Sequence, residues 1–123
     1  MTDVEKLAAF VGRTAYADFS DAADQQLKIR VLDALGALDG ERVRLIRAQI
    51  EDFGGAPRCT LMGGGLTAPD RAAFYNSALV RYLDFNDGYL AKDETCYPSD
   101  NLGAIVAAAE YAYGNGRDLL TTA

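Results

Sequence analysis

Helical spacing of apolar residues is the feature that most constrains this fold. In five segments of the chain, apolar residues recur three or four positions apart, and glycine or polar clusters separate the segments. This spacing is typical of one face of an α-helix, whereas a half-buried strand alternates apolar and polar residues. We therefore expect an all-α fold of about five to six helices, with the last one starting near Arg117.

The expected helices have the following bounds and faces. The first spans about 3–16, the second runs from Ser20 to about Leu38, and the third spans about 41–53. The fourth follows Thr67 and the fifth follows Ser99 or Asp100. The residues expected to be buried on the first, third, fourth and fifth helices are Val4, Leu7, Ala8, Val11 and Ala15; Val43, Ile46, Ile50 and Phe53; Ala72, Tyr75, Asn76, Leu79, Val80 and Leu83; and Leu102, Ile105, Val106, Ala109 and Tyr113.

Local signals support these bounds. Ser20 and Thr67 are expected N-caps, because their hydroxyls can accept backbone N–H groups, and Pro69 suits a first turn. Gly36 lies inside the second helical pattern at a cost of about 1 kcal/mol relative to alanine, and close helix packing would explain it. Pro57 interrupts helical spacing, so residues 56–62 are expected to be extended.

Charge and composition exclude several classes of function. A net charge of −6 disfavours nucleic acid and anionic membranes as partners, since both attract clustered Lys and Arg. No apolar run approaches the ~20 residues of a membrane span, and the N-terminus lacks the features of a signal peptide. Two cysteines, Cys59 and Cys96, make no disulfide framework, so a cytoplasmic location with reduced thiols is expected. The absence of histidine removes the commonest metal ligand and general base.

A polar loop after the fourth helix carries most of the reactive side chains. Asp84 and Asp87 are three residues apart, a spacing that brings two carboxylates together on a helix. One could then hold a proton while the other stays ionised, which suits acid–base chemistry on a carboxylic acid. The alternative is a solvated connection with good helix caps. A calcium loop is excluded, because Gly88 has no side-chain ligand and Thr95 stands where the closing Glu would be needed.

Two motifs in this loop, Leu83-Asp84-Phe85-Asn86-Asp87 and Pro98-Ser99-Asp100-Asn101-Leu102, resemble the MmgE/PrpD family. That family includes 2-methylcitrate dehydratases, cis-aconitate decarboxylases and iminodisuccinate epimerases. The resemblance extends over nearly the whole chain, and several motifs in the right order are more specific than any one alone. The further motifs are Leu32-Asp33-Ala34-Leu35-Gly36, Ala68-Pro69-Asp70-Arg71-Ala72-Ala73 and Gly116-Arg117-Asp118-Leu119-Leu120.

The resemblance implies an architecture and an activity. Residues 1–123 correspond to the N-terminal part of the family's helical domain, which is usually found in a homodimer. Family enzymes are several-fold longer, act on tricarboxylic acids and need no metal or organic cofactor. We therefore expect a fragment or truncated relative of a 2-methylcitrate dehydratase-like lyase of propionate metabolism, inactive as the isolated chain. Whether this chain is itself an enzyme stays open; the family's members are carbon–oxygen or carbon–carbon lyases.

The resemblance also assigns site residues. Asp84 and Tyr97 take the catalytic positions, although the family usually has histidine where Tyr97 stands. A phenol is a poor base at neutral pH but can donate a proton or a hydrogen bond. The family usually has threonine at the position of Gly88. The implied substrate-binding positions are Asn86, Asp87, Gly88, Ser99 and Asn101, and no metal ligand is implied.

Two other functions remain open. The chain could be a non-catalytic helical module that pairs with a full-length paralogue through an exposed core face. It could also be a stand-alone carboxylate-binding protein that uses Asp87, Ser99 and Asn101.

Overall fold

The computed structural model describes residues 1–36, 40–84, 86–90 and 92–122. Within these ranges the α-helices are α1 (Asp3–Arg13), α2 (Asp21–Leu35), α3 (Glu41–Phe53), α4 (Pro69–Arg81), α5 (Leu102–Tyr111) and α6 (Gly116–Thr122). The 3-10 turns are η1 (Tyr16–Asp18) and η2 (Pro98–Asn101). The strands are β1 (Cys59–Thr60), β2 (Leu66–Thr67), β3 (Tyr89–Leu90) and β4 (Thr95–Cys96). The expected all-α class is confirmed as a mostly helical fold with two short antiparallel strand pairs.

The helix ends follow the sequence signals at several points. Ser20 caps α2 as expected, with its side chain accepting the backbone N–H of Ala23. The bounds of α3 match the expected ones, because glycines flank it and Gly54 ends it at a φ of 64°. The first helix ends three residues before the expected Tyr16. The predicted end of the second helix, Leu38, lies outside the described residues.

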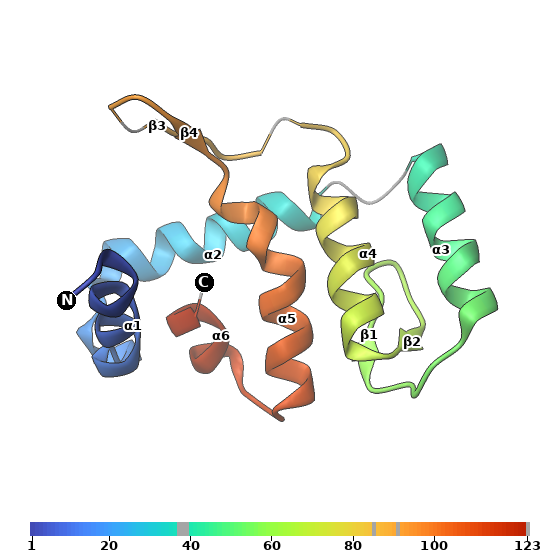
Figure 1. The fold of residues 1–123 in the computed structure, drawn as a ribbon, viewed down its shortest axis with the longest axis horizontal. Coiled ribbons are helices and arrows are strands. Elements are labelled where there is room, and N and C mark those ends of the chain that lie inside the picture. The colour runs from blue at the N-terminus through green and yellow to red at the C-terminus, as the bar shows by residue number, and fades with distance from the viewer. Residues whose placement is uncertain (37–39, 85, 91, 123) are drawn as a thin grey trace.

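The centre of the fold is the pair α4 and α5, which lie side by side and run in opposite directions (Figure 1). Gly103 permits this close approach, since a Cβ there would lie 2.3 Å from the backbone nitrogen of Ser77. The expected buried face of α4 is confirmed for all its members except Leu83, which follows the end of the helix and is exposed. Around this pair the buried core consists of Ala34, Val43, Ile50, Leu61, Met62, Tyr75, Leu79, Val80 and Leu102.

A short hairpin, β1–β2, packs at the start of α4 (Figure 1). Three glycines with positive φ angles, Gly63–Gly65, form its turn. The buried side chain of Asn76 joins the hairpin to α4, because it accepts from the Met62 backbone N–H and donates to the Thr60 carbonyl, both at 2.9 Å. The prediction of Thr67 as an N-cap is wrong: Thr67 is buried in β2, and Ala68 precedes the helix without a side-chain cap.

Several expected core positions are exposed instead. No residue of α1 is buried, and its apolar side chains Val4 and Leu7 are 77% and 63% exposed. Phe53 and Tyr113 are likewise exposed, because each lies at the end of its helix beyond the packed region. Gly36 ends α2 and a Cβ there would meet only the carbonyl of Asp33, so the expected role in close helix packing is wrong. In the described ranges no helix combines the length and apolar character that crossing a membrane requires.

Candidate functional site

The polar loop, residues 82–101, leaves the end of α4 and returns at the start of α5. Because these two helices are antiparallel neighbours, both ends of the loop lie at the same end of the pair (Figure 1). Within the loop, β3 and β4 pair in antiparallel register, Tyr89 with Cys96 and Leu90 with Thr95. This hairpin projects away from the helices, and the residues on either side of it connect it to α4 and α5 (Figure 1). The candidate site is formed by those flanking residues.

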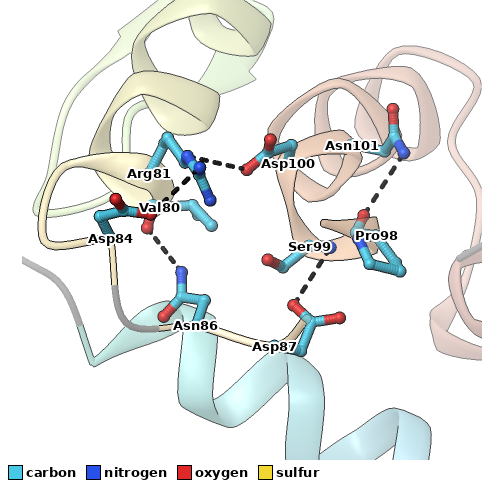
Figure 2. Close-up of polar contacts among 9 residues, drawn as sticks. All are labelled: Val80, Arg81, Asp84, Asn86, Asp87, Pro98, Ser99, Asp100 and Asn101. Carbon is cyan, nitrogen blue, oxygen red and sulfur yellow. Dashed lines mark hydrogen bonds and ion pairs between the residues drawn. The ribbon is translucent and has the colours of Figure 1, made fainter. Parts of the chain in front are cut away.

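Arg81, the last residue of α4, is the centre of one polar cluster. Its Nη2 lies 3.0 Å from Asp84 Oδ1, and its Nε lies 3.9 Å from Asp100 Oδ1 (Figure 2). Its guanidinium carbon lies 3.8 Å from the centroid of the Tyr97 ring. Burial lowers the pKa of Arg81, but the hydrogen bond with Tyr97 and the carboxylates of Asp100 and Asp84 outweigh it, so the pKa is raised. The guanidinium therefore stays charged and holds both predicted catalytic residues, Asp84 and Tyr97.

Asp87 and Ser99 form a second cluster beside the first. The backbone N–H of Ser99 donates to Asp87 Oδ1 at 3.3 Å (Figure 2). The expectation that Ser99 or Asp100 caps the fifth helix is wrong, because the 3-10 turn η2 precedes α5 and its N-cap, Asn101, makes no side-chain cap bond. The Ser99 hydroxyl is buried and makes no hydrogen bond to the described part of the chain.

A pocket of about 80 Å³ opens next to this second cluster. It lies where α2 faces η2 and the start of α5, and it is lined by Leu27, Arg30, Val31, Asp87, Pro98, Ser99, Leu102 and Ile105. Ligand pockets usually measure about 300–1,000 Å³. This pocket is therefore smaller than a usual ligand site, with mainly apolar walls and a few polar groups.

The other predicted site residues lie around these clusters. Asn86 donates from Nδ2 to the Val80 carbonyl at 2.6 Å, which ties the loop back to α4 (Figure 2). Asn101 is exposed and donates to the Pro98 carbonyl at 3.4 Å. Gly88 is exposed, and a Cβ there would lie 3.9 Å from Tyr97, which is ordinary contact. A Cβ therefore fits at this position without displacing Tyr97 or Thr95.

The expected helical pairing of Asp84 with Asp87 is wrong. The helix ends at Arg81, and Asp84 has a φ of 53°, a left-handed conformation outside any helix. The two carboxylates instead have separate partners, Arg81 for Asp84 and the Ser99 N–H for Asp87 (Figure 2). Each carboxylate is thus held by its own donor.

The chemistry available here is acid–base chemistry and the binding of polar ligands. Asp84 presents a carboxylate, and Tyr97 presents a phenol that is 37% exposed beside it on the same arginine. Within the described ranges, His, Cys, Asp and Glu side chains form no group of three or more that could hold a metal ion.

Sequence reasoning missed two residues of this region. Arg81 could have been found locally, since it precedes Asp84 by three positions at a helix end, a spacing that favours an ion pair. Arg30 had no such signal, because its place in the pocket depends on the packing of α2 against residues almost 70 positions later in the chain.

Comparison with known proteins finds a family model and several relatives that match this chain. The family model of the MmgE/PrpD N-terminal domain matches residues 5–123. A 2-methylcitrate dehydratase of Salmonella typhi is 53% identical over 47 residues, which cover 38% of this chain and 10% of the relative. A 2-methylcitrate dehydratase of Cupriavidus necator is 49% identical over 57 residues, which cover 43% of this chain and 12% of the relative. A 2-methylcitrate dehydratase-like protein of Aspergillus oryzae, oryR, is 32% identical over 110 residues, which cover 74% of this chain and 20% of the relative.

No solved structure matches the chain. The matched segments span only a tenth to a fifth of these relatives' length. The family model, in contrast, accounts for almost every residue of the chain. The chain therefore belongs to the MmgE/PrpD family, and its residues 5–123 match the N-terminal domain of that family.

Proposed function

We propose that this chain is the N-terminal part of a cofactor-free lyase that acts on tricarboxylic acids in the manner of 2-methylcitrate dehydratase. The observation that carries the proposal is the position of Asp84 and Tyr97 on one arginine, Arg81. Two groups that can accept and donate protons are thereby held together at the end of the α4–α5 pair. The names of the relatives supply the substrate class.

The reaction requires two proton transfers. A proton leaves the carbon beside a carboxylate, and the hydroxyl on the adjacent carbon leaves as water once it has received a proton. In our proposal Asp84 accepts the first proton and the Tyr97 O–H donates toward the leaving hydroxyl. Asn86, Asp87, Gly88, Ser99 and Asn101 contact the substrate.

A pocket of about 80 Å³ is too small to enclose a tricarboxylic acid. We infer that the remaining walls come from other parts of a longer polypeptide or from a second subunit, and that residues 1–123 alone are inactive. A homodimer and a cytoplasmic location belong to the same proposal.

The test is a chimera. Residues 5–123 replace the matching N-terminal segment of the Salmonella typhi 2-methylcitrate dehydratase, and formation of the unsaturated acid is followed by its ultraviolet absorbance. We expect turnover that Tyr97→His and Gly88→Thr together raise, because both restore the residue types usual in the family. Asp84→Asn should abolish turnover, while Asp93→Asn, in the exposed tip of the β3–β4 hairpin, is the matched control. Lack of turnover in a folded chimera, both with and without the two restoring substitutions, rejects the proposal.

One observation favours a second function, a non-catalytic module that pairs with a full-length paralogue. The apolar side chains of α1 are exposed, including Val4, Leu7, Phe10 and Val11. Its test is co-sedimentation of the purified chain with a purified full-length family member from the same organism. Association that is lost in Leu7→Glu and kept in Lys6→Glu supports this function, and independent sedimentation of the two proteins rejects it.

A further inference from the structure

The site residues predicted from the sequence carry no positive charge. Asp84 and Asp87 are carboxylates, and the remaining predicted residues are neutral. A tricarboxylic acid is an anion, and anion sites in proteins usually rely on Arg, Lys or clustered backbone N–H groups. Arg81 is already paired with two carboxylates. A second cation is therefore needed to bind an anionic substrate here.

Arg30 supplies such a charge. It projects from α2 and lines the pocket that Asp87 and Ser99 also line. It is exposed, and within the described ranges it makes no hydrogen bond or ion pair. The neighbouring cation two residues earlier, Lys28, is bound to Asp24 at 2.6 Å. The five donors of the Arg30 guanidinium can thus all turn to a ligand.

Ser99 lines the same pocket and carries a hydroxyl that lacks a partner in the described part of the chain. Its hydroxyl is buried and makes no hydrogen bond to the described residues, although its backbone N–H is bonded to Asp87. Buried hydroxyls in folded proteins are nearly always hydrogen-bonded. A ligand oxygen that reaches the pocket would satisfy this group and would lie near the Arg30 charge.

The walls between these polar groups are aliphatic. Leu27, Val31, Leu102 and Ile105 line the pocket together with Pro98. A volume of about 80 Å³ exceeds the ~10–15 Å³ that one water molecule needs, but is far below that of a complete ligand site. The space therefore suits one short arm of a ligand, with methylene groups against the walls and a charged end at the arginine.

We propose that this pocket binds an aliphatic arm that ends in a carboxylate, with Arg30 as its counter-ion and the Ser99 hydroxyl as a second donor. Asp87, which carries the opposite charge, accepts a hydrogen bond from a hydroxyl of the same ligand. The ligand class is therefore a hydroxycarboxylic acid. The inference rests on the proposed function for the reaction in which this acid takes part, whereas the binding itself is tested on this chain alone.

The probe is succinate, each half of which has the methylene group and terminal carboxylate of one arm of a tricarboxylic acid. It is titrated into the purified 123-residue chain, and amide chemical shifts report binding at Ser99 and Leu102. Succinamide is the neutral control ligand. We expect saturable shifts with succinate and none with succinamide.

Four variants locate the charge. Arg30→Gln should weaken succinate binding on the order of tenfold, because a charged hydrogen bond contributes about 1.5–3 kcal/mol. Arg30→Lys should retain part of the affinity, and Ser99→Ala should lose a few-fold. Arg42→Gln, with the same charge change at an exposed position of α3, should bind as the parent chain does. Thermal unfolding of each variant confirms that the fold is kept.

The outcomes separate this inference from the proposed function. Unchanged affinity in Arg30→Gln, equal binding of succinamide, or no succinate binding to the parent chain overturns it. If the dehydratase chimera is inactive while the chain binds succinate through Arg30, only the proposed function fails. If the chimera is active and Arg30→Gln leaves its KM unchanged, only the inference fails.

Discussion

The guanidinium of Arg81 stacks on the ring of Tyr97, with 3.8 Å between the guanidinium carbon and the ring centroid. Arg81 belongs to α4 and Tyr97 immediately precedes η2, so the contact joins the two ends of the polar loop across more than a dozen intervening residues. The same arginine is paired with Asp84 and Asp100. One side chain thus fixes the distance between the two ends of the loop and the positions of both predicted catalytic groups.

Replacement of Arg81 should therefore weaken the fold. We expect Arg81→Met to reduce the free energy of unfolding by about 1 kcal/mol, the sum of a partly exposed cation–π contact and weak ion pairs. Urea denaturation measures this loss. Arg117→Met is the matched control, because that guanidinium lies 5.4 Å from the Tyr16 ring centroid. Equal losses in the two variants would show that the contact with Tyr97 adds nothing.

Two glycines should respond to alanine in opposite directions. At Gly103 a Cβ would lie 2.3 Å from the Ser77 nitrogen and 2.8 Å from the Asn76 carbonyl carbon, so α4 and α5 would have to separate. Gly103→Ala should destabilise the chain by about 3 kcal/mol. At Gly12, within α1, nothing lies within 4 Å of the added Cβ, so Gly12→Ala should stabilise by about 0.5–1 kcal/mol. Thermal and urea unfolding check both signs, and a tolerated Gly103→Ala contradicts the close helix pairing.

The two thiols should differ strongly in reactivity. Cys59 is fully buried and its Sγ donates to the Ala107 carbonyl at 3.3 Å, whereas Cys96 is exposed on β4. Burial, and to a lesser extent the Glu110 carboxylate, raise the pKa of the Cys59 thiol above its ordinary value. In the Cys96→Ser chain a disulfide reagent should react at least about 100-fold more slowly before unfolding than after it. The Cys59→Ser chain, which keeps only Cys96, should react at similar rates in both states.

Asp24 should make stability depend on pH in the acid range. Hydrogen bonds from Lys28 and then Tyr16, at 2.6 and 2.7 Å, lower the pKa of Asp24 below its ordinary value of 3.8. The stability that these bonds contribute is therefore fully present above the unfolded-state pKa and is lost as the pH falls through the lower folded-state pKa. Asp24→Asn should flatten the acid decline in stability, and Tyr16→Phe should flatten it in part. Urea denaturation between about pH 3 and about pH 7 measures the slopes, and parallel slopes in all three proteins would contradict the assignment.

Helices with strong local signals could be predicted from the sequence. The bounds of α3 follow from glycines on both sides, and the start of α4 follows from Pro69. Thr67 shows the limit of this reasoning, because a hydroxyl residue before a helix has the pattern of an N-cap whether or not it pairs in a strand. Its pairing with Cys59 depends on a turn that only the three-dimensional structure reveals.

The sequence motifs named residues that lie close together, but they did not predict the geometry of those residues. The motifs identified Asp84, Asp87 and Ser99, and these residues do lie together at the end of the α4–α5 pair. The helical relationship between the two aspartates was wrong because the helix ends at Arg81. Arg30 was missed because it reaches the site through the packing of α2, which no local spacing encodes.

The close pairing of α4 and α5 has a consequence for how this region can evolve. Their contact at Gly103 and Ser77 does not depend on the length of the segment that connects them. The entropy of closing a loop grows only logarithmically, by about 0.6 kcal/mol for each doubling of length. Insertions and deletions in the β3–β4 hairpin therefore cost little stability. They also fall next to the candidate site, so under the proposed function changes of length, as well as point substitutions, would alter which acid is accepted.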